Sequence, residues 1–181
     1  MIKNRKKGNE SWYHASGAGS CSRKLYFESV EKVEPTNPLD DKTKRLLRLG
    51  NLVHDDFEKA LTHYNRVHNK VHNNVHHQEK EINNKEKGLK FHTEQEIRIE
   101  DLNVRGFYDI VAEGEEVYLY DLKTCGGYAW KMKFGRKPVF NSSIHYELQL
   151  GTYGYAIREQ LGRLDGMYLY YYNKDTSMMR A

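Results

Sequence analysis

The stretch of sequence that decides the fold is VRGFYDIVAEGEEVYLYDLKT, residues 104–124. It predicts two strands, Val104–Ala112 and Val117–Thr124, and Gly114 with its acidic neighbours forms the turn between them. A tight turn makes the two strands neighbours in one sheet. The polar residues on the two strands are therefore expected to lie close together.

The rest of the chain supplies elements that surround this hairpin. Apolar residues recur every three or four positions from about Asp41 to the mid-70s, which predicts one long amphipathic helix. The further predicted elements are a strand at Phe91–Glu100, a helix from about Ser142 to Leu161 that Gly162 caps, and a strand at Met167–Tyr172. The order helix, three strands, helix, strand indicates an α/β fold.

Length and composition suit a single domain, residues 1–181, with a buried core: 38% of the residues are hydrophobic and 30% are charged. No stretch approaches the roughly 20 apolar residues of a membrane span, and no apolar segment follows the basic N-terminus. We therefore expect neither a membrane segment nor a secretory signal. The two cysteines, Cys21 and Cys125, are too few for a disulfide framework, which favours a cytoplasmic, intracellular protein.

Three segments stand apart from the predicted core by their composition. Residues 1–40 form an N-terminal arm, and residues 63–90 form a His-rich helix end or insertion. Residues 128–138 are expected to be a loop that mixes cations with aromatic rings, a composition typical of a grip on single-stranded nucleic acid. A solvated loop without such a role is the alternative. The net charge of +4 is compatible with a polyanionic partner.

The residues that suggest chemistry begin with Asp121 and Lys123. Alternate residues of a strand face the same side, so these two side chains point together and Leu122 points away. A carboxylate can hold a hard cation that activates water, and an ammonium can offset negative charge that develops on a phosphate. A second carboxylate is needed to hold such a cation, and Asp109 on the preceding strand is the natural candidate.

Two helices add polar residues to this centre. On the long helix, Gly50 allows a close approach and His54 faces the protein, which makes His54 a candidate third metal ligand. Glu96 on the first strand is a weaker candidate for the same site. On the second helix, His145, Gln149 and Tyr153 are spaced by four and form one polar ridge that can donate hydrogen bonds to a phosphate.

The ordered set of these motifs resembles the RecB-like branch of the PD-(D/E)XK nuclease superfamily. The resemblance runs from about Cys21 to Tyr172. It consists of CSRKLY at 21–26, GNLVH at 50–54, GFYD at 106–109, DLK at 121–123 and QLGTY at 149–153. Bacteriophage exonucleases and CRISPR-associated exonucleases of this branch are the most similar, and a phage-encoded protein is compatible with the resemblance.

The resemblance implies a restriction-endonuclease-like core, with a central mixed sheet flanked by helices. It also implies that His54, Asp109, Asp121 and the Leu122 backbone carbonyl hold Mg²⁺ or Mn²⁺, that Lys123 assists catalysis, and that Gln149 and Tyr153 lie by the DNA backbone. The implied activity is metal-dependent hydrolysis of single-stranded DNA or duplex ends by an exonuclease. Further DNA contacts are expected from His145, Arg23, Lys131, Lys133 and Arg136.

The sequence departs from this branch in its cysteines. Many members carry an iron–sulphur cluster held by one cysteine near the start and three near the end. Cys21 lies where the first would be, but no cysteine follows Cys125. We therefore expect no iron–sulphur cluster.

Simpler interpretations remain for each motif. Asp121 and Lys123 alone would also fit a surface ion pair, Asp109 a turn residue, His54 a core histidine, and Gln149 with Tyr153 a solvated helix face. The histidines at 68, 72 and 76 share one helical face and would fit a Zn²⁺ or Ni²⁺ site or an exposed polar face. For the whole chain, the rival to an enzyme is a non-catalytic nucleic-acid-binding module. The carboxylates favour the enzyme, because without a metal they repel a polyanion.

Overall fold

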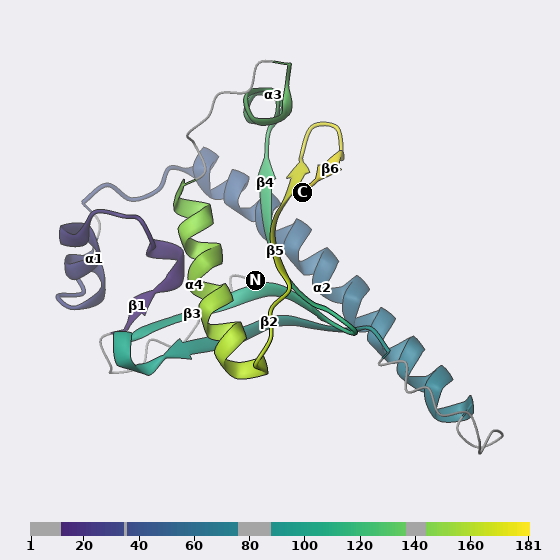
Figure 1. Ribbon diagram of the computed structural model, residues 1–181. Coiled ribbons are helices and arrows are strands. Elements are labelled where there is room, and N and C mark those ends of the chain that lie inside the picture. The colour runs from purple at the N-terminus through teal and green to yellow at the C-terminus, as the bar shows by residue number, and fades with distance from the viewer. Residues whose placement is uncertain (1–11, 35, 76–87, 137–143) are drawn as a thin grey trace.

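The computed structural model describes residues 12–34, 36–75, 88–136 and 144–181 of the chain, and Figure 1 shows their arrangement. The elements in chain order are β1 (Tyr13–His14), η1 (Ala15–Gly17), α1 (Ser22–Ser29), α2 (Asp41–Val75), β2 (Lys90–Ile99), η2 (Glu100–Leu102), β3 (Val104–Glu113), β4 (Val117–Cys125), α3 (Gly127–Phe134), α4 (Ile144–Leu161), β5 (Gly166–Asn173) and β6 (Met179–Arg180). The predicted order of helix, three strands, helix and strand is confirmed. The expected arm adds the short strand β1 and the helix α1.

The prediction of a loop at 128–138 is wrong over its first part, because residues 127–134 form α3. No proline and no internal glycine interrupts this segment, so its residues can continue a helix once one has started. The start is stabilised from a distance, since the Gly127 N–H donates a hydrogen bond of 2.6 Å to Oδ2 of Asp175, which follows β5. Lys131 and Lys133 lie in the last turn, where cations interact favourably with the helix dipole.

The sheet is mixed, as predicted, and it has two wings. In one wing β2 pairs with β3 in antiparallel fashion along its whole length, and β1 pairs in parallel with the start of β3. In the other wing β4 pairs in parallel with β5, and β6 pairs with β5. The wings meet where residues 110–113 of β3 pair with residues 117–120 of β4. Figure 1 shows the wings running in clearly different directions from this junction.

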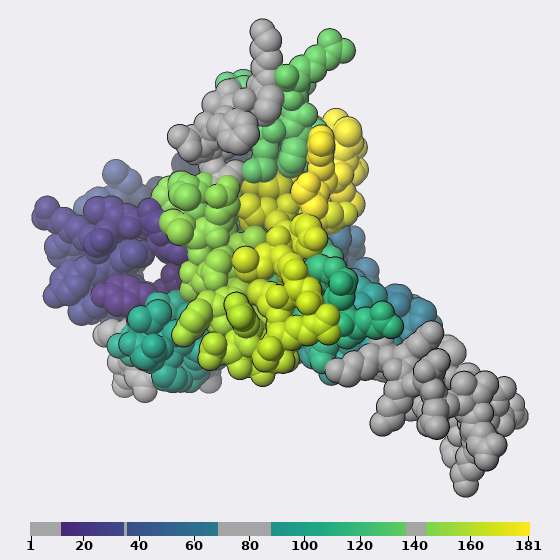
Figure 2. Space-filling model, in the orientation of Figure 1, coloured from purple at the N-terminus to yellow at the C-terminus, as the bar shows by residue number. Residues whose placement is uncertain are grey.

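Helices cover this mixed sheet on both sides. In Figure 1, α4 lies in front of the sheet and α2 passes behind it, and both helices contact β2 and β4. The buried core includes Ile97, Val111, Leu119 and Ile157. In Figure 2, α4 and β5 fill the centre of the visible face, and α1 and α3 lie at its margins. Within the described residues, no helix combines the length and the apolarity that a membrane span needs.

The separation of β3 and β4 beyond their short ladder leaves backbone groups without a strand partner. The Leu122 N–H lies just past the last paired residue, Tyr120, and it donates a hydrogen bond of 2.6 Å to Oδ2 of Asp109. A buried N–H without a partner is costly, so the carboxylate of Asp109 takes the place of a strand carbonyl. The fork between the strands is therefore held by a side chain.

On β3, a glycine allows close contact with α4. A Cβ added to Gly106 would lie 2.7 Å from Cε1 of Tyr153 on α4 and 2.8 Å from the Cβ of Ala15. Both neighbours are buried in the core and have no free space to move into. Gly106 therefore allows α4 to pack directly on β3.

Replacing Gly106 with Ala should destabilise the protein by about 1–3 kcal/mol through overpacking. The matched control is Gly151→Ala on α4, where an added Cβ meets nothing within 4 Å and the helix should gain about 0.5–1 kcal/mol. Denaturant unfolding of both variants in EDTA measures the difference. Equal stability of the two variants would contradict the close packing at Gly106.

The role of Asp109 at the fork predicts a difference between two substitutions. Asp109→Asn keeps an oxygen that can accept the Leu122 N–H, whereas Asp109→Leu leaves that N–H unpaired. Asp109→Leu should be less stable than Asp109→Asn by about 1–3 kcal/mol. Denaturant unfolding without metal measures this difference independently of catalysis. If the Leu variant is as stable as the Asn variant, the fork does not depend on this hydrogen bond.

Candidate active site

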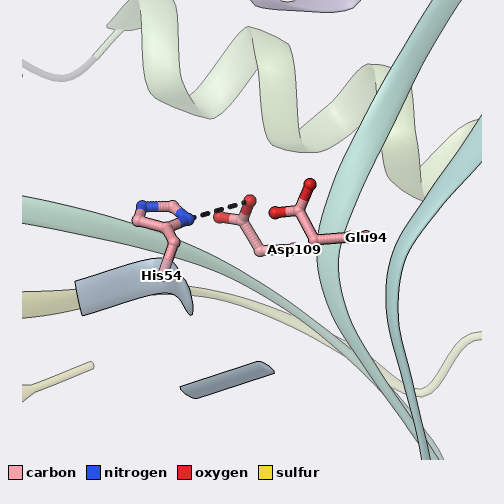
Figure 3. A group of neighbouring side chains, drawn as sticks. All are labelled: His54, Glu94 and Asp109. Atoms are coloured by element: carbon pink, nitrogen blue, oxygen red, sulfur yellow. Dashed lines mark ion pairs between the residues drawn. The ribbon is translucent and has the colours of Figure 1, made fainter. Parts of the chain in front are cut away.

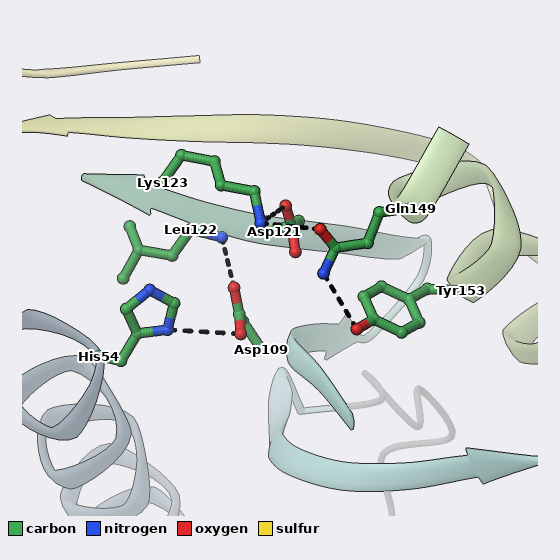
Figure 4. A network of polar contacts seen from close by, with 7 residues as sticks. All are labelled: His54, Asp109, Asp121, Leu122, Lys123, Gln149 and Tyr153. Carbon is green, nitrogen blue, oxygen red and sulfur yellow. Dashed lines mark hydrogen bonds and ion pairs between the residues drawn. The ribbon is translucent and has the colours of Figure 1, made fainter. Parts of the chain in front are cut away.

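The candidate site lies at the fork between β3 and β4, and Asp109 is at its centre. One carboxylate oxygen accepts the Leu122 N–H, and the other, Oδ1, lies 3.4 Å from Nδ1 of His54 (Figure 4). Asp109 is half-buried on β3, within the predicted strand. Its oxygens therefore join β3 to β4 and to α2.

His54 reaches the fork because α2 approaches β4 closely one turn earlier. A Cβ added to Gly50 would lie 3.1 Å from Oγ1 of Thr124, which is tighter than an ordinary contact, so the glycine allows this close approach. The His54 side chain is half-buried, with Asp109 as its polar neighbour. Burial alone would lower the pKa of His54, but the contact and charge of Asp109 outweigh it and raise that pKa above its ordinary value.

Asp121 and Lys123 form an ion pair in which the carboxylate is buried and the lysine half-buried, so the alternative of a surface ion pair is wrong. Asp121 is 1% exposed, and its Oδ2 lies 2.6 Å from Nζ of Lys123. No described residue donates a hydrogen bond of normal geometry to that oxygen. Burial raises the pKa of Asp121 above its usual range, the nearby Asp109 charge raises it further, and Lys123 opposes both effects. A second cation near Asp121 would therefore be stabilising.

The polar residues of α4 continue this network towards the core. Nζ of Lys123 donates to Oε1 of Gln149 at 3.2 Å, and Nε2 of Gln149 donates to the Tyr153 hydroxyl at 3.1 Å. Lys123 also lies over the ring of Tyr146, with Nζ 4.9 Å from its centroid. Tyr153 belongs to the core, so the alternative of a solvated face is wrong for this residue. The expectation that Tyr153 lies by the DNA backbone is corrected too: its ring is buried, and its hydroxyl orients Gln149.

The other residues expected to contact DNA lie on α1, α3 and α4, or just beyond α3. His145 is exposed near the start of α4, and Arg23 is exposed on α1. On α3, Lys131 and Arg136, just beyond the helix, are exposed, whereas Lys133 lies over the Tyr171 ring at 4.4 Å from its centroid. Their contact with DNA stays a prediction.

One site residue was missed by the sequence prediction. Ligand atoms of His54, Glu94 and Asp109 all lie within 4.8 Å of one another, and Figure 3 shows the two carboxylates side by side with His54 facing them. Glu96, the residue considered from the sequence, is exposed and pairs with Arg98 at 3.2 Å. The structure therefore brings Glu94 to the site and leaves Glu96 outside it. Its position opposite Asp109 could have been found only with the strand register.

The remaining candidates lie outside the fork or outside the described residues. His68 stacks on Tyr64 at a centroid distance of 4.0 Å. The His72 side chain and His76 lie outside what the structure describes. Cys21 is exposed and Cys125 is half-buried, and both are free thiols.

The donor set at the fork fits a divalent cation. It offers carboxylate oxygens and one imidazole, and the buried Oδ2 of Asp121 has a charged neighbour but no regular hydrogen bond. Hard oxygen donors suit Mg²⁺ and Mn²⁺, and an imidazole is compatible with Mn²⁺. Because these donors lie beside the half-buried Lys123, a cation held there would be close to the ammonium that a bound phosphate would meet.

Comparisons with known proteins identify the family of this chain. The family model of the PD-(D/E)XK nuclease superfamily matches residues 11–179. The crystal structure of SSO0001 is similar in fold, with a TM-score of 0.51 and 15% sequence identity over 97% of this chain and 68% of that chain. Among curated proteins, no sequence matches the chain significantly. Since the family model spans nearly the whole chain, this protein belongs to the PD-(D/E)XK nuclease superfamily, whose nucleases use divalent metals.

Proposed function

We propose that this protein is a Mg²⁺- or Mn²⁺-dependent deoxyribonuclease of the RecB-like branch that hydrolyses DNA from an end. The observation that carries the proposal is the ion pair of the buried Asp121 with the half-buried Lys123, beside Asp109 at the fork. A buried carboxylate paired with a half-buried ammonium, next to a second carboxylate, suits the hydrolysis of a phosphodiester. The order of the sequence motifs supports the branch and the exonuclease mode.

The metal would be held by His54, Asp109, Asp121 and the backbone carbonyl of Leu122. A bound divalent cation would supply a water of lowered pKa and would shield the charge of the phosphate. Asp109 is fixed by the Leu122 N–H before any metal arrives, so its oxygens are already oriented. Preorganised ligands lose little freedom on binding, which favours both affinity and correct placement.

Lys123 would act on the developing charge of the reacting phosphate. Its ammonium is held between Asp121 and Gln149, and the Tyr146 ring covers it. In this position it can orient the attacking water and stabilise the additional negative charge of the transition state. Tyr153 orients Gln149 through its hydroxyl, and is a positioning residue rather than a contact to DNA.

The DNA backbone would be held around the fork by Gln149 and His145 on α4, by Arg23 on α1, and by the cations on and just beyond α3. Of these last, Lys131 and Arg136 are exposed and available, whereas Lys133 is engaged with Tyr171. Contacts of this kind neutralise phosphates without reading base sequence. They suit an enzyme that acts on DNA without sequence preference.

The rival function is a nucleic-acid-binding module that has kept the fold without catalysis. A binding module has no use for Asp109 and a buried Asp121, because buried carboxylates are costly and repel a polyanion. The presence of both carboxylates together with Lys123 therefore favours an enzyme over a binding module.

Digestion of end-labelled DNA tests the proposed function. The protein should shorten linear single-stranded or duplex DNA in Mn²⁺ or Mg²⁺, lose this activity in EDTA, and regain it when the metal is restored. Covalently closed circular DNA is the control for the exonuclease mode and should resist. Cleavage that persists in EDTA would rule out the metal mechanism, and rapid cutting of circles would rule out dependence on an end.

Two substitutions separate metal binding from the chemical step. Asp121→Ala should lose metal affinity and cleavage together, because it removes an anion that holds the cation. Lys123→Ala should still bind metal and DNA but cleave about 10²–10³-fold more slowly, because the ammonium helps only as charge develops. Single-turnover cleavage beside metal titration measures both effects.

The matched control is Lys42→Ala. Lys42 belongs to a second D-x-K sequence, Asp40-Asp41-Lys42, and is exposed near the start of α2. This variant should cleave at the wild-type rate. If Lys123→Ala also cleaves at that rate, Lys123 has no part in the reaction.

A further inference from the structure

We infer that Glu94 is a direct ligand of the divalent metal, in addition to the residues that the sequence motifs supply. The inference rests on the metal site of the proposed function and adds a residue from β2 to it. Glu94 places a carboxylate oxygen in the same group as a nitrogen of His54 and an oxygen of Asp109, with all three atoms within 4.8 Å of one another. Figure 3 shows the three side chains converging from α2, β2 and β3.

The strand register explains why Glu94 and not Glu96 reaches the site. Thr93 pairs with Ile110 and Gln95 pairs with Tyr108, so Glu94 lies opposite Asp109. Glu96 pairs instead with Phe107, two residues before Asp109 on β3, and its side chain contacts Arg98 of its own strand. Of the two glutamates, Glu94 is therefore the one that lies opposite Asp109.

The backbone of Glu94 also departs from a regular strand. Its φ is +51°, in the left-handed region that residues other than Gly, Asn and Asp seldom adopt. Such conformations persist where the surrounding structure maintains them, and they are concentrated at functional sites. Here the departure occurs at the residue whose carboxylate joins the group around His54.

The charges around Glu94 favour a bound cation. Glu94, Asp109 and Asp121 bring three carboxylates to the fork, and Lys123 is paired with the most buried of them. His54 feels the charges of both Asp109 and Glu94. A divalent ion would lie among oxygens that otherwise repel one another, and a further carboxylate raises the affinity of a site for hard cations.

The experiment measures Mn²⁺ binding directly by titration calorimetry and by the paramagnetic resonance of free Mn²⁺, without DNA. Glu94→Gln keeps the size of the side chain and removes its charge. It should weaken Mn²⁺ binding at least tenfold, and the thermal stabilisation that Mn²⁺ gives should fall accordingly. Glu96→Gln, two residues along the same strand, is the matched control and should bind Mn²⁺ like the wild type.

The melting temperature in EDTA distinguishes a ligand from a structural residue. Without metal, Glu94→Gln removes both a repulsion from Asp109 and an attraction to His54, so its melting temperature should stay close to that of the wild type. Wild-type Mn²⁺ affinity in Glu94→Gln would overturn the inference. A lower metal-free melting temperature in this variant would assign Glu94 a structural role and would overturn it as well.

The proposed function and the inference fail in different ways. Asp109→Asn supplies the comparison, because Asp109 belongs to the proposed metal site with or without Glu94. If Asp109→Asn loses Mn²⁺ affinity and Glu94→Gln keeps it, the metal site survives and Glu94 is excluded. If wild-type protein binds Mn²⁺ but cleaves no DNA, the proposed nuclease fails while the assignment of Glu94 still stands or falls by its own titration.

Discussion

The hydrogen bond from the Leu122 N–H to the Asp109 carboxylate is the interaction on which the site depends. β3 and β4 pair over four residues each and then separate, and this hydrogen bond links them beyond that ladder. The separation creates the space in which His54, Asp109 and Asp121 approach one another. If pairing continued past Tyr120, backbone carbonyls of β3 would occupy this space. The Leu122 N–H would then bond to one of these carbonyls and not to the Asp109 carboxylate. The fold therefore produces the site by leaving a strand pair incomplete.

The incomplete pair has an electrostatic consequence. Asp121 is buried, its pKa is raised mainly by burial, and Lys123 offsets only part of the cost. Asp109 and Glu94 add further negative charge on the side of His54. Carboxylates so close to one another lower the stability of the protein when no cation is present, and a divalent ion bound at the proposed site would restore that stability. Binding of the metal and stability of the fork are thus two measures of the same interaction.

The sequence was sufficient for the parts of this arrangement that follow from local periodicity. The helix at Asp41–Val75, the hairpin and the pairing of Asp121 with Lys123 on one strand follow from spacings of two, three or four residues. The sequence was insufficient where the position of a residue depends on contacts with residues distant in the chain. Glu94 and Glu96 have the same parity on β2, and only the register against β3 separates them. Likewise, α3 begins at Gly127 because Asp175, 48 residues away, accepts its N–H. The burial of Tyr153 depends on the absence of a Cβ at Gly106. The spacing of polar residues along α4 does not contain this information.

The same packing explains why a short motif becomes a site in one place and not in another. Asp40-Asp41-Lys42 has the spacing of Asp121-Leu122-Lys123, but Asp40 accepts the Thr43 N–H at 2.7 Å and so caps α2 in solvent. Asp121 instead lies on a strand between two others, where its partners are fixed by β3, β5 and α4. Gly106 lets Tyr153 approach β3, Tyr153 orients Gln149, and Gln149 holds Lys123. Three motifs that are separate in the sequence therefore form one chain of contacts, so their order along the sequence is a consequence of the fold that joins them.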